Sequence, residues 1–221
     1  MTLDDAAIEF YDNPEPRCPC VLLLDTSGSM INERIAALNA GLHTFRDNLL
    51  QDSLASKRVE VAIVAFDTTV SIKHEFATAE NFQPPILTAQ GLTYTASGIN
   101  KALDMLQERK RQYRENGISH YRPWVFMITD GAPYGEEQYL LTQAAQRIKE
   151  EEASKRVAFF SVGVEGADIQ ALQELTVREP IKLKGLNFQE MFVWLSASMA
   201  RVSHSKPDEQ VPLQPVGWGA V

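Results

Sequence analysis

Cysteine is scarce in this sequence of 221 residues, which contains only Cys18 and Cys20. Two thiols cannot build a disulfide framework, so the low cysteine content agrees with a reducing compartment. Together they could begin a zinc site, but there is no further cysteine, and the four histidines are scattered without ligand spacing. We expect both cysteines to be reduced and to lie in the turn that leads into a buried strand.

Long apolar runs and an excess of basic residues are also missing. No stretch approaches the roughly 20 apolar residues that cross a bilayer, and the start, with Asp4, Asp5 and Glu9, lacks the pattern of a signal peptide. The formal charge is −8, which gives no electrostatic reason to bind nucleic acid or an anionic membrane. A cytoplasmic protein that attracts cations or basic partners fits this balance better.

Length and composition favour a single domain. Hydrophobic residues make up 44% and charged residues 23% of the chain, which is typical of a soluble globular protein, and the length suits one large α/β domain. Residues 1–17, with Pro14 and Pro16, are expected to form an extended lead-in. The domain is then expected to cover residues 18–203 and to be followed by a proline-rich tail, 204–221, without a periodic element.

Strand and helix patterns alternate through this central part. Apolar and β-branched runs predict strands at 21–25, 59–66, 70–76, 124–129, 157–164 and 181–183. Apolar residues at steps of three and four predict helices over 31–49, 99–113, 136–152, 169–175 and 188–202. The strand at 70–76 follows its predecessor too closely for a crossover, so it should be an antiparallel edge strand. We predict a doubly wound, Rossmann-like α/β fold with a mostly parallel sheet of about six strands.

Oxygen-bearing side chains gather where these segments end. Asp25, Ser27 and Ser29 follow the first strand, Thr93 lies in a loop, and Asp130 follows the fourth strand. Such side chains at one sheet edge suit a hard cation, and a site with few carboxylates suits Mg²⁺, with Mn²⁺ or Ca²⁺ as alternatives. We expect the three hydroxyls to bind the metal directly and the two carboxylates to hold its waters or the serine hydroxyls.

The order of these motifs resembles the von Willebrand factor A (VWA) domain family and its metal-ion-dependent adhesion site (MIDAS). Residues 25–29 give Asp-x-Ser-x-Ser, residues 91–93 give Gly-x-Thr and residues 129–131 give Thr-Asp-Gly, so all five expected positions are filled. The resemblance covers about residues 18–203. It implies a protein-binding module in which an acidic side chain of a partner fills the vacant position on the metal.

A closer likeness links the chain to the bacterial TerY and YegL-like subgroup, which is associated with tellurite resistance. Residues 13–20, residues 121–124 and the Gly217-Trp218 pair carry it. The resemblance implies a role in a stress response, with kinase-like and phosphatase-like proteins as partners.

Large side chains flank the three motifs. Met30, Tyr94 and Tyr134 are expected to surround the metal and to offer contact area to a partner, although Met30 could be half core and Tyr94 a cover for its loop. Trp218, in the tail, could dock on a partner or fold back onto its own domain.

Other interpretations stay open. Ser29 could simply cap the following helix, which would make the chain a scaffold without a metal. Asp25 stands where haloacid-dehalogenase-type phosphatases place their nucleophile, but the second aspartate that they need two residues on is Ser27 here. No other catalytic signature is present, so we do not predict an enzyme and keep a Mg²⁺-dependent phosphatase as the alternative. The basic run at 108–114 is interpreted as a solvated helix face.

Overall fold

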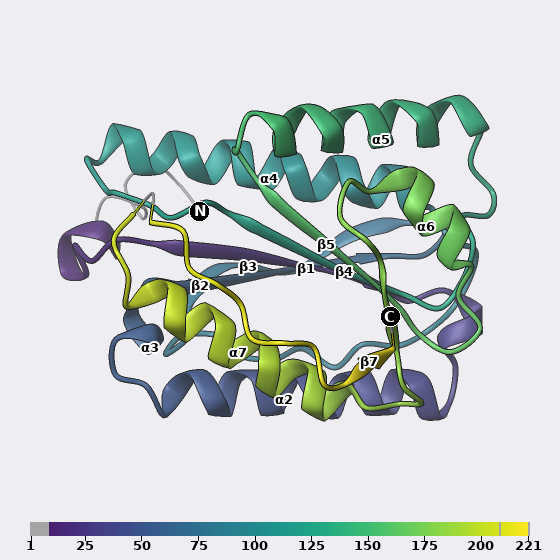
Figure 1. Cartoon of the computed structure of the whole chain (residues 1–221), viewed down its shortest axis with the longest axis horizontal. Helices are drawn as coiled ribbons and strands as arrows, with labels where there is room; N and C mark the ends of the chain where they lie inside the picture. The colour runs from purple at the N-terminus through teal and green to yellow at the C-terminus, as the bar shows by residue number, and fades with distance from the viewer. Residues whose placement is uncertain (1–8, 208, 221) are drawn as a thin grey trace.

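The computed structural model describes residues 9–207 and 209–220. Its centre is a seven-stranded sheet in the order β3-β2-β1-β4-β5-β6-β7. Helices α4, α5 and α6 cover one face of the sheet, and α2, α3 and α7 cover the other (Figure 1). In the part of the chain that is described, no helix is both long and apolar enough to cross a bilayer.

Most strands of the sheet are parallel and fully buried. The strands are β1 (Cys18–Asp25), β2 (Val59–Phe66), β3 (Val70–Thr78), β4 (Trp124–Thr129), β5 (Ala158–Gly163), β6 (Ile181–Leu183) and β7 (Gly219–Ala220). Only β3 and β7 run antiparallel to their neighbours. All residues of β1, β2, β4 and β5 are buried, as expected for a sheet covered on both faces. The predicted six strands and the antiparallel edge strand are confirmed.

The long helices follow the apolar spacing of the sequence. They are α2 (Glu33–Leu50), α4 (Thr95–Glu115), α5 (Gln138–Ala153), α6 (Ile169–Leu175) and α7 (Phe188–Ser203). Two short helices within the central part were not predicted: the 3₁₀ helix η1 (Gly28–Met30) and α3 (Ala55–Arg58). Neither is long enough to show a helical period in the sequence.

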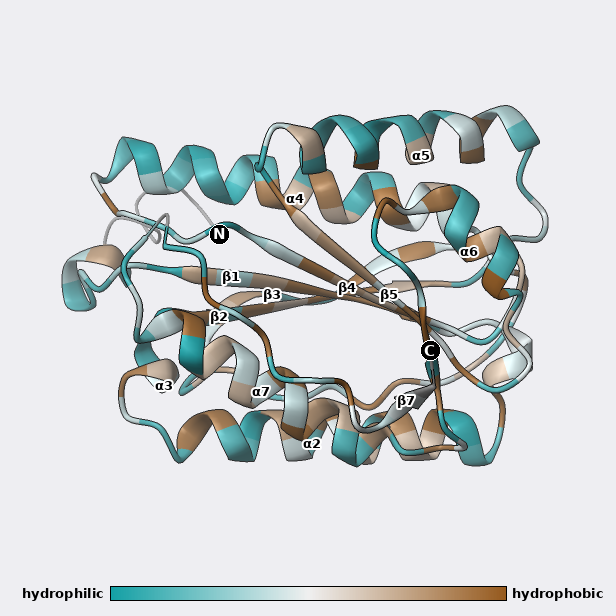
Figure 2. Cartoon of the chain, in the orientation of Figure 1, coloured by the Kyte–Doolittle hydropathy of each residue, from teal (hydrophilic) through white to brown (hydrophobic). Residues whose placement is uncertain are grey.

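Two apolar layers hold the helices on the sheet, and the inward sides of the helices are accordingly the more hydrophobic ones (Figure 2). In the lower layer, Phe45 of α2 and Phe192 of α7 have ring centroids 5.6 Å apart. Gly41 of α2 makes room for the Phe192 ring, because a Cβ at that position would lie 2.5 Å from it. The sheet is thereby fixed between two packed helical layers.

The two cysteines lie inside β1 and not in a turn before it, so that prediction was wrong. Burial raises the pKa of Cys18 to about 12, with a smaller contribution from the negative charge of Glu60. Burial also raises the pKa of Cys20 well above its ordinary value. Both side chains are therefore neutral thiols in the sheet interior, and metal binding would require the thiolate form.

The two ends of the chain differ in part from the prediction. Residues 9–12 are helical and not extended, while the rest of the predicted lead-in up to residue 8 lies outside the described residues. In the tail, β7 pairs with β6, and Trp218 is only 2% exposed and packs edge-on against Trp194. Trp218 thus folds back onto its own domain.

The basic run on α4 is not a purely solvated face. Arg109 is 2% exposed, and its Nε donates to Glu60 Oε2 at 2.9 Å. Glu60, fully buried in β2, also accepts hydrogen bonds from Arg17 Nε at 2.8 Å and from the Tyr113 hydroxyl. Burial alone would lower the pKa of Arg109, but the hydrogen bond and charge of Glu60 outweigh burial and raise it. This buried ionic cluster closes the end of the sheet where β1 and β2 begin.

Candidate metal centre

Asp25 is held rigidly at the carboxyl end of β1. It is fully buried, its Oδ1 accepts from the Ser27 backbone N–H at 2.8 Å, and its Oδ2 accepts from the Thr129 hydroxyl at 2.6 Å. Thr129 ends β4, which is the parallel neighbour of β1. The first and third motifs are therefore joined through one carboxylate.

A string of hydrogen bonds connects three more of the predicted residues. The hydroxyl oxygens of Ser27 and Ser29 are 2.9 Å apart, and the Ser29 hydroxyl donates to Asp130 Oδ1 at 2.6 Å. Ser27 and Asp130 are buried, whereas Ser29 is exposed. The predicted grouping of these residues at one edge of the sheet is thus present in the structure.

Thr93 reaches the same edge through its backbone. Its N–H and C=O groups both pair with Tyr134 at 3.1 Å, which links the second motif to the loop after Asp130. The N–H of Gly28 donates to Gly91 O at 3.0 Å, which links the second motif to the first. Among the described residues, no hydrogen bond joins the Thr93 hydroxyl to the other four side chains. That hydroxyl thus stays available to a ligand.

Gly91 must be glycine for this loop to close. Its φ of +75° is rarely adopted by other residues, and a Cβ there would lie 2.3 Å from Thr68 Oγ1. The same hydroxyl accepts from the backbone N–H of Leu92 at 2.8 Å. The close approach at Gly91 therefore positions the loop that carries Thr93.

Two acidic residues that were not predicted position this loop further. Asp67 follows β2, accepts from the Thr26 hydroxyl at 3.1 Å through its carboxylate, and accepts from the Tyr94 N–H at 3.1 Å through its backbone oxygen. Glu136 accepts from the backbone N–H groups of Ala96 and Ser97 at 2.7 and 2.9 Å, at the start of α4. Asp67 had a signal in the sequence, since it comes directly after an apolar strand run, much as Asp25 closes one.

Arg34 is a third residue that the sequence did not indicate. Its Nη1 donates to Asp130 Oδ2 and, at 3.0 Å, to the backbone oxygen of Ser29. The Arg34 side chain is 32% exposed, whereas the Asp130 side chain is fully buried. A permanent positive charge thus lies beside the predicted metal ligands.

The donor set fits a hard cation. Burial raises the pKa of Asp25, hydrogen bonds from Thr129 and Ser27 act in the opposite direction, and the negative charge of Asp130 adds to the rise. A cation nearby would offset both the burial of the ionised Asp25 carboxylate and its repulsion by Asp130. In residues 9–207 and 209–220, no three or more His, Cys, Asp and Glu side chains are grouped to hold one ion. The neighbouring donors are hydroxyl and carboxylate oxygens, which Mg²⁺ accepts and Zn²⁺ structural sites seldom use.

The predicted contact residues differ in exposure. Met30 is fully buried in the layer beneath the site, so it offers no area to a partner and that prediction was wrong. Tyr94 is partly buried, and Tyr134 is 69% exposed. Ile31 and Leu92, which were not predicted, are 49% and 36% exposed near the first and second motifs. Apolar area at this edge therefore comes from Tyr134, Ile31 and Leu92.

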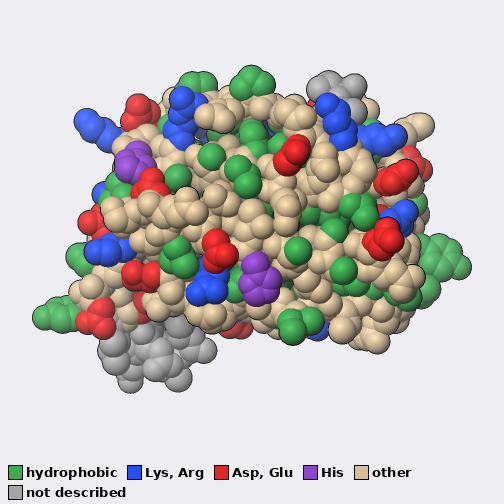
Figure 3. All heavy atoms as spheres, turned by 90° about the horizontal axis from the view of Figure 1, so that it is seen from below, with side chains coloured by type: hydrophobic (Ala, Val, Ile, Leu, Met, Phe, Trp, Pro, Cys, Tyr) green, Lys and Arg blue, Asp and Glu red, His purple; other side chains and the backbone are tan. Residues whose placement is uncertain are grey.

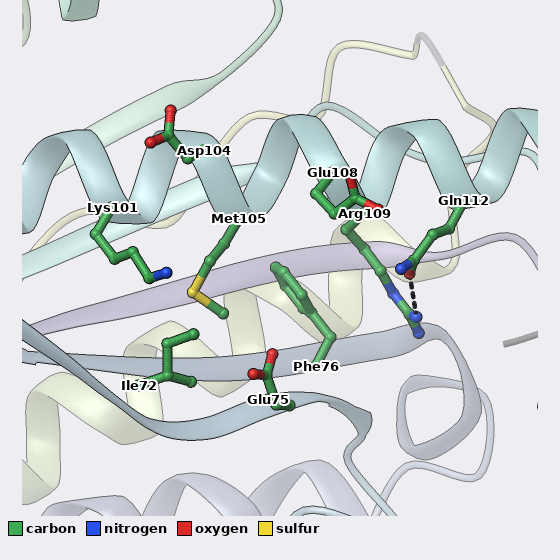
Figure 4. Close-up of a pocket in the computed structure, with 9 residues that line it drawn as sticks. All are labelled: Ile72, Glu75, Phe76, Lys101, Asp104, Met105, Glu108, Arg109 and Gln112. Atoms are coloured by element: carbon green, nitrogen blue, oxygen red, sulfur yellow. Dashed lines mark hydrogen bonds between the residues drawn. The ribbon is translucent and has the colours of Figure 1, made fainter. Parts of the chain in front are cut away.

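A separate hollow of about 430 Å³ lies between β3 and α4 (Figure 4). Its lining includes none of the five predicted ligands and consists of Ile72, Glu75, Phe76, Lys101, Asp104, Met105, Glu108, Arg109 and Gln112. Acidic and basic side chains mix around it, as they do on the face seen from below in Figure 3. The hollow has the wrong position and donor set for the candidate metal centre.

Comparison with solved structures supports the fold. The pilus adhesin SpaC from Lactobacillus rhamnosus GG, in an open conformation, aligns with a TM-score of 0.67 at 17% identity, over 85% of this chain and 30% of that one. A von Willebrand factor type A protein from Catenulispora acidiphila gives 0.61 at 16%, over 85% and 43%. The PilB minor pilin from Streptococcus sanguinis gives 0.63 at 14%, over 84% and 62%. This chain thus spans less than two thirds of each of these neighbours, and the likeness concerns the fold alone.

Comparison with protein families gives a direct assignment. Curated protein sequences gave no match. The model of the von Willebrand factor type A domain matches residues 20–190, which is most of the chain and includes all three motifs. The chain therefore belongs to the von Willebrand factor type A domain family.

Proposed function

We propose that this chain is a metal-dependent protein-binding module, in which a divalent cation at the MIDAS motifs takes an acidic side chain of a partner as a ligand. The hydrogen-bonded string from Ser27 through Ser29 to Asp130, beside the fixed carboxylate of Asp25, carries the proposal. Mg²⁺ is the proposed ion, with Mn²⁺ or Ca²⁺ as alternatives.

We propose a separate role for the hydroxyls and for the carboxylates of the site. The hydroxyls of Ser27, Ser29 and Thr93 are the proposed direct ligands, because a hydroxyl oxygen has two lone pairs and can bind a cation while its O–H donates, as the Ser29 O–H does to Asp130. Asp25 and Asp130 orient these hydroxyls and the waters around the ion. A bound cation with neutral near ligands would keep enough positive charge to attract an external carboxylate. Tyr134, Ile31 and Leu92 would add apolar contact area around it.

We propose that the module is not an enzyme. Both oxygens of Asp25 are occupied by hydrogen bonds, so this carboxylate is poorly placed to act as a nucleophile. The position two residues on, where the phosphatase alternative needs an acid, is a serine that belongs to the hydroxyl string. Turnover of an aryl phosphate that is lost in Asp25→Asn would favour the alternative.

The cellular setting proposed here rests on the sequence likeness to the TerY and YegL-like subgroup. It places the chain in the cytoplasm, in a tellurite or other stress response, with kinase-like or phosphatase-like partners.

Capture of partners from cell lysate tests the proposed function. In the presence of Mg²⁺, we expect the wild-type chain to retain proteins that are released by a chelator and that Ser27→Ala fails to retain. Thr142→Ala is the matched control, because the hydroxyl of Thr142 bonds only its own helix, to Gln138 O at 3.1 Å, and it should behave as wild type. Retention of the same proteins in chelator and by Ser27→Ala would refute metal-dependent binding.

A further inference from the structure

Arg34 occupies a special position beside the candidate metal centre. It lies in the first turn of α2, only one residue after the helix begins, and reaches across to the end of β4. The loop between β5 and α6 also lies against it, since a Cβ at Gly166 would be 3.7 Å from Arg34 Nη2. The guanidinium thus lies where the start of α2, the end of β4 and the loop between β5 and α6 come together.

Both oxygens of Asp130 are engaged in this arrangement. Oδ1 accepts from the Ser29 hydroxyl at 2.6 Å, and Oδ2 accepts from Arg34. The same Nη1 also donates to the backbone oxygen of Ser29. Among the described residues, neither Nη2 nor Nε of Arg34 has a hydrogen-bond partner. One side of the guanidinium therefore binds the site, and the other remains free to bind an anion.

The charges of these groups have a simple consequence. When both carboxylates are ionised, Asp25, Asp130 and the guanidinium of Arg34 together carry a single negative charge, because Arg stays protonated in proteins. A bound divalent cation would bring the net charge of this group to +1, which one carboxylate from a partner neutralises. Without Arg34, the two carboxylates would offset more of the charge of the cation, and less positive charge would remain to attract the carboxylate of a partner.

We propose that Arg34 weakens the hold of the site on its cation in the free chain and makes cation binding and partner binding mutually dependent. This inference rests on the proposed function, because it concerns the same site. By thermodynamic linkage, an acidic ligand that tightens cation binding is itself bound more tightly by the loaded chain, by the same factor. Arg34 is thus a positioning residue that acts through Asp130 and through its charge.

Calorimetric titration of Mg²⁺ into the metal-free chain, with and without acetate as the carboxylate probe, tests this role. Without acetate, Arg34→Gln is expected to bind Mg²⁺ about tenfold more tightly than wild type, which is the scale of one removed charge near a partly exposed ion. Arg34→Lys keeps the charge and should bind as wild type does. Acetate should tighten Mg²⁺ binding in wild type more than in Arg34→Gln.

Arg111→Gln is the matched control, because Arg111 is 52% exposed and pairs with Glu108 and Glu115 on α4. Equal or weaker Mg²⁺ binding by Arg34→Gln would overturn the inference, and so would a tightening that Arg34→Lys or Arg111→Gln shares. If the wild-type chain still binds Mg²⁺ in those cases and Ser27→Ala does not, the metal site itself stands. Absence of Mg²⁺ binding in wild type and in Arg34→Gln alike would refute both the site and the inference.

Discussion

Glu60→Gln is expected to lower the free energy of unfolding by about 3–5 kcal/mol, the cost of leaving buried charges without their partner. Glu60 is fully buried and receives hydrogen bonds from Arg17, Arg109 and the hydroxyl of Tyr113. The two guanidinium groups are themselves almost wholly buried. A neutral amide removes the carboxylate that both guanidinium groups share and leaves Arg109 with Glu9 as its remaining ion-pair partner. Its NH₂ group cannot accept the hydrogen bonds that the carboxylate accepted.

Denaturant unfolding measures this effect, and Glu75→Gln provides the matched control. Glu75 is exposed on the edge strand β3, so its replacement should change stability by no more than about 0.5 kcal/mol. A loss below about 1 kcal/mol in Glu60→Gln would show that the ionic cluster is not needed. The cluster lies at the opposite end of β1 and β2 from Asp25, so the folded fraction of this variant should still bind Mg²⁺.

Asp25→Asn is expected to weaken Mg²⁺ binding by about 10–100-fold, the usual effect of losing a carboxylate that orients metal ligands. The variant keeps the shape of the side chain but removes a negative charge beside the Ser27 hydroxyl. Asp104→Asn is the control, because its side chain is 64% exposed and pairs with Arg147 on the surface. Calorimetry of both variants against wild type measures the effect.

The stability of the metal-free protein shows whether Asp25 serves metal binding or holds the fold together. The pKa of Asp25 is raised, chiefly by burial, so the ionised carboxylate costs stability at neutral pH, and this cost falls as the pH drops through the raised pKa. The neutral amide avoids this cost, and the Thr129 hydroxyl, which now donates to Asp25, can instead accept a hydrogen bond from the amide NH₂. Asp25→Asn should therefore melt, without metal, no lower than wild type at pH 7. A large loss of stability together with unchanged Mg²⁺ affinity would assign Asp25 to the fold instead.

The order of elements and the grouping of the motifs were predictable because they depend on local patterns. The apolar runs that end at Asp25 and Thr129 predict buried strands, and parallel strands bring their carboxyl ends to one edge. Hydrogen bonds now connect Ser27, Ser29 and Asp130 at that edge. The predicted place of the Thr93 hydroxyl among the metal ligands stays a prediction, because loop geometry depends on contacts such as that between Gly91 and Thr68.

The errors concern residues whose surroundings come from distant parts of the chain. Arg109 stands in a basic run that looks solvated, yet it is buried because Glu60, 49 positions away, faces it across the layer. Arg34 contacts Asp130, which lies 96 positions later in the sequence, and no local spacing predicts that contact. Met30 was assigned to the surface because it adjoins Ser29, but η1 turns it into the core.

A crystal structure with Mn²⁺, whose anomalous signal locates the ion, tests whether one divalent cation binds at the three motifs. We expect one anomalous peak at bonding distance from the hydroxyl oxygens of Ser27, Ser29 and Thr93. Asp25 and Asp130 should lie one shell further out, and the remaining position on the ion should hold water or an acidic side chain. No peak at this edge with Mn²⁺ in excess, or a peak that none of these hydroxyls touches, would contradict the proposed metal site.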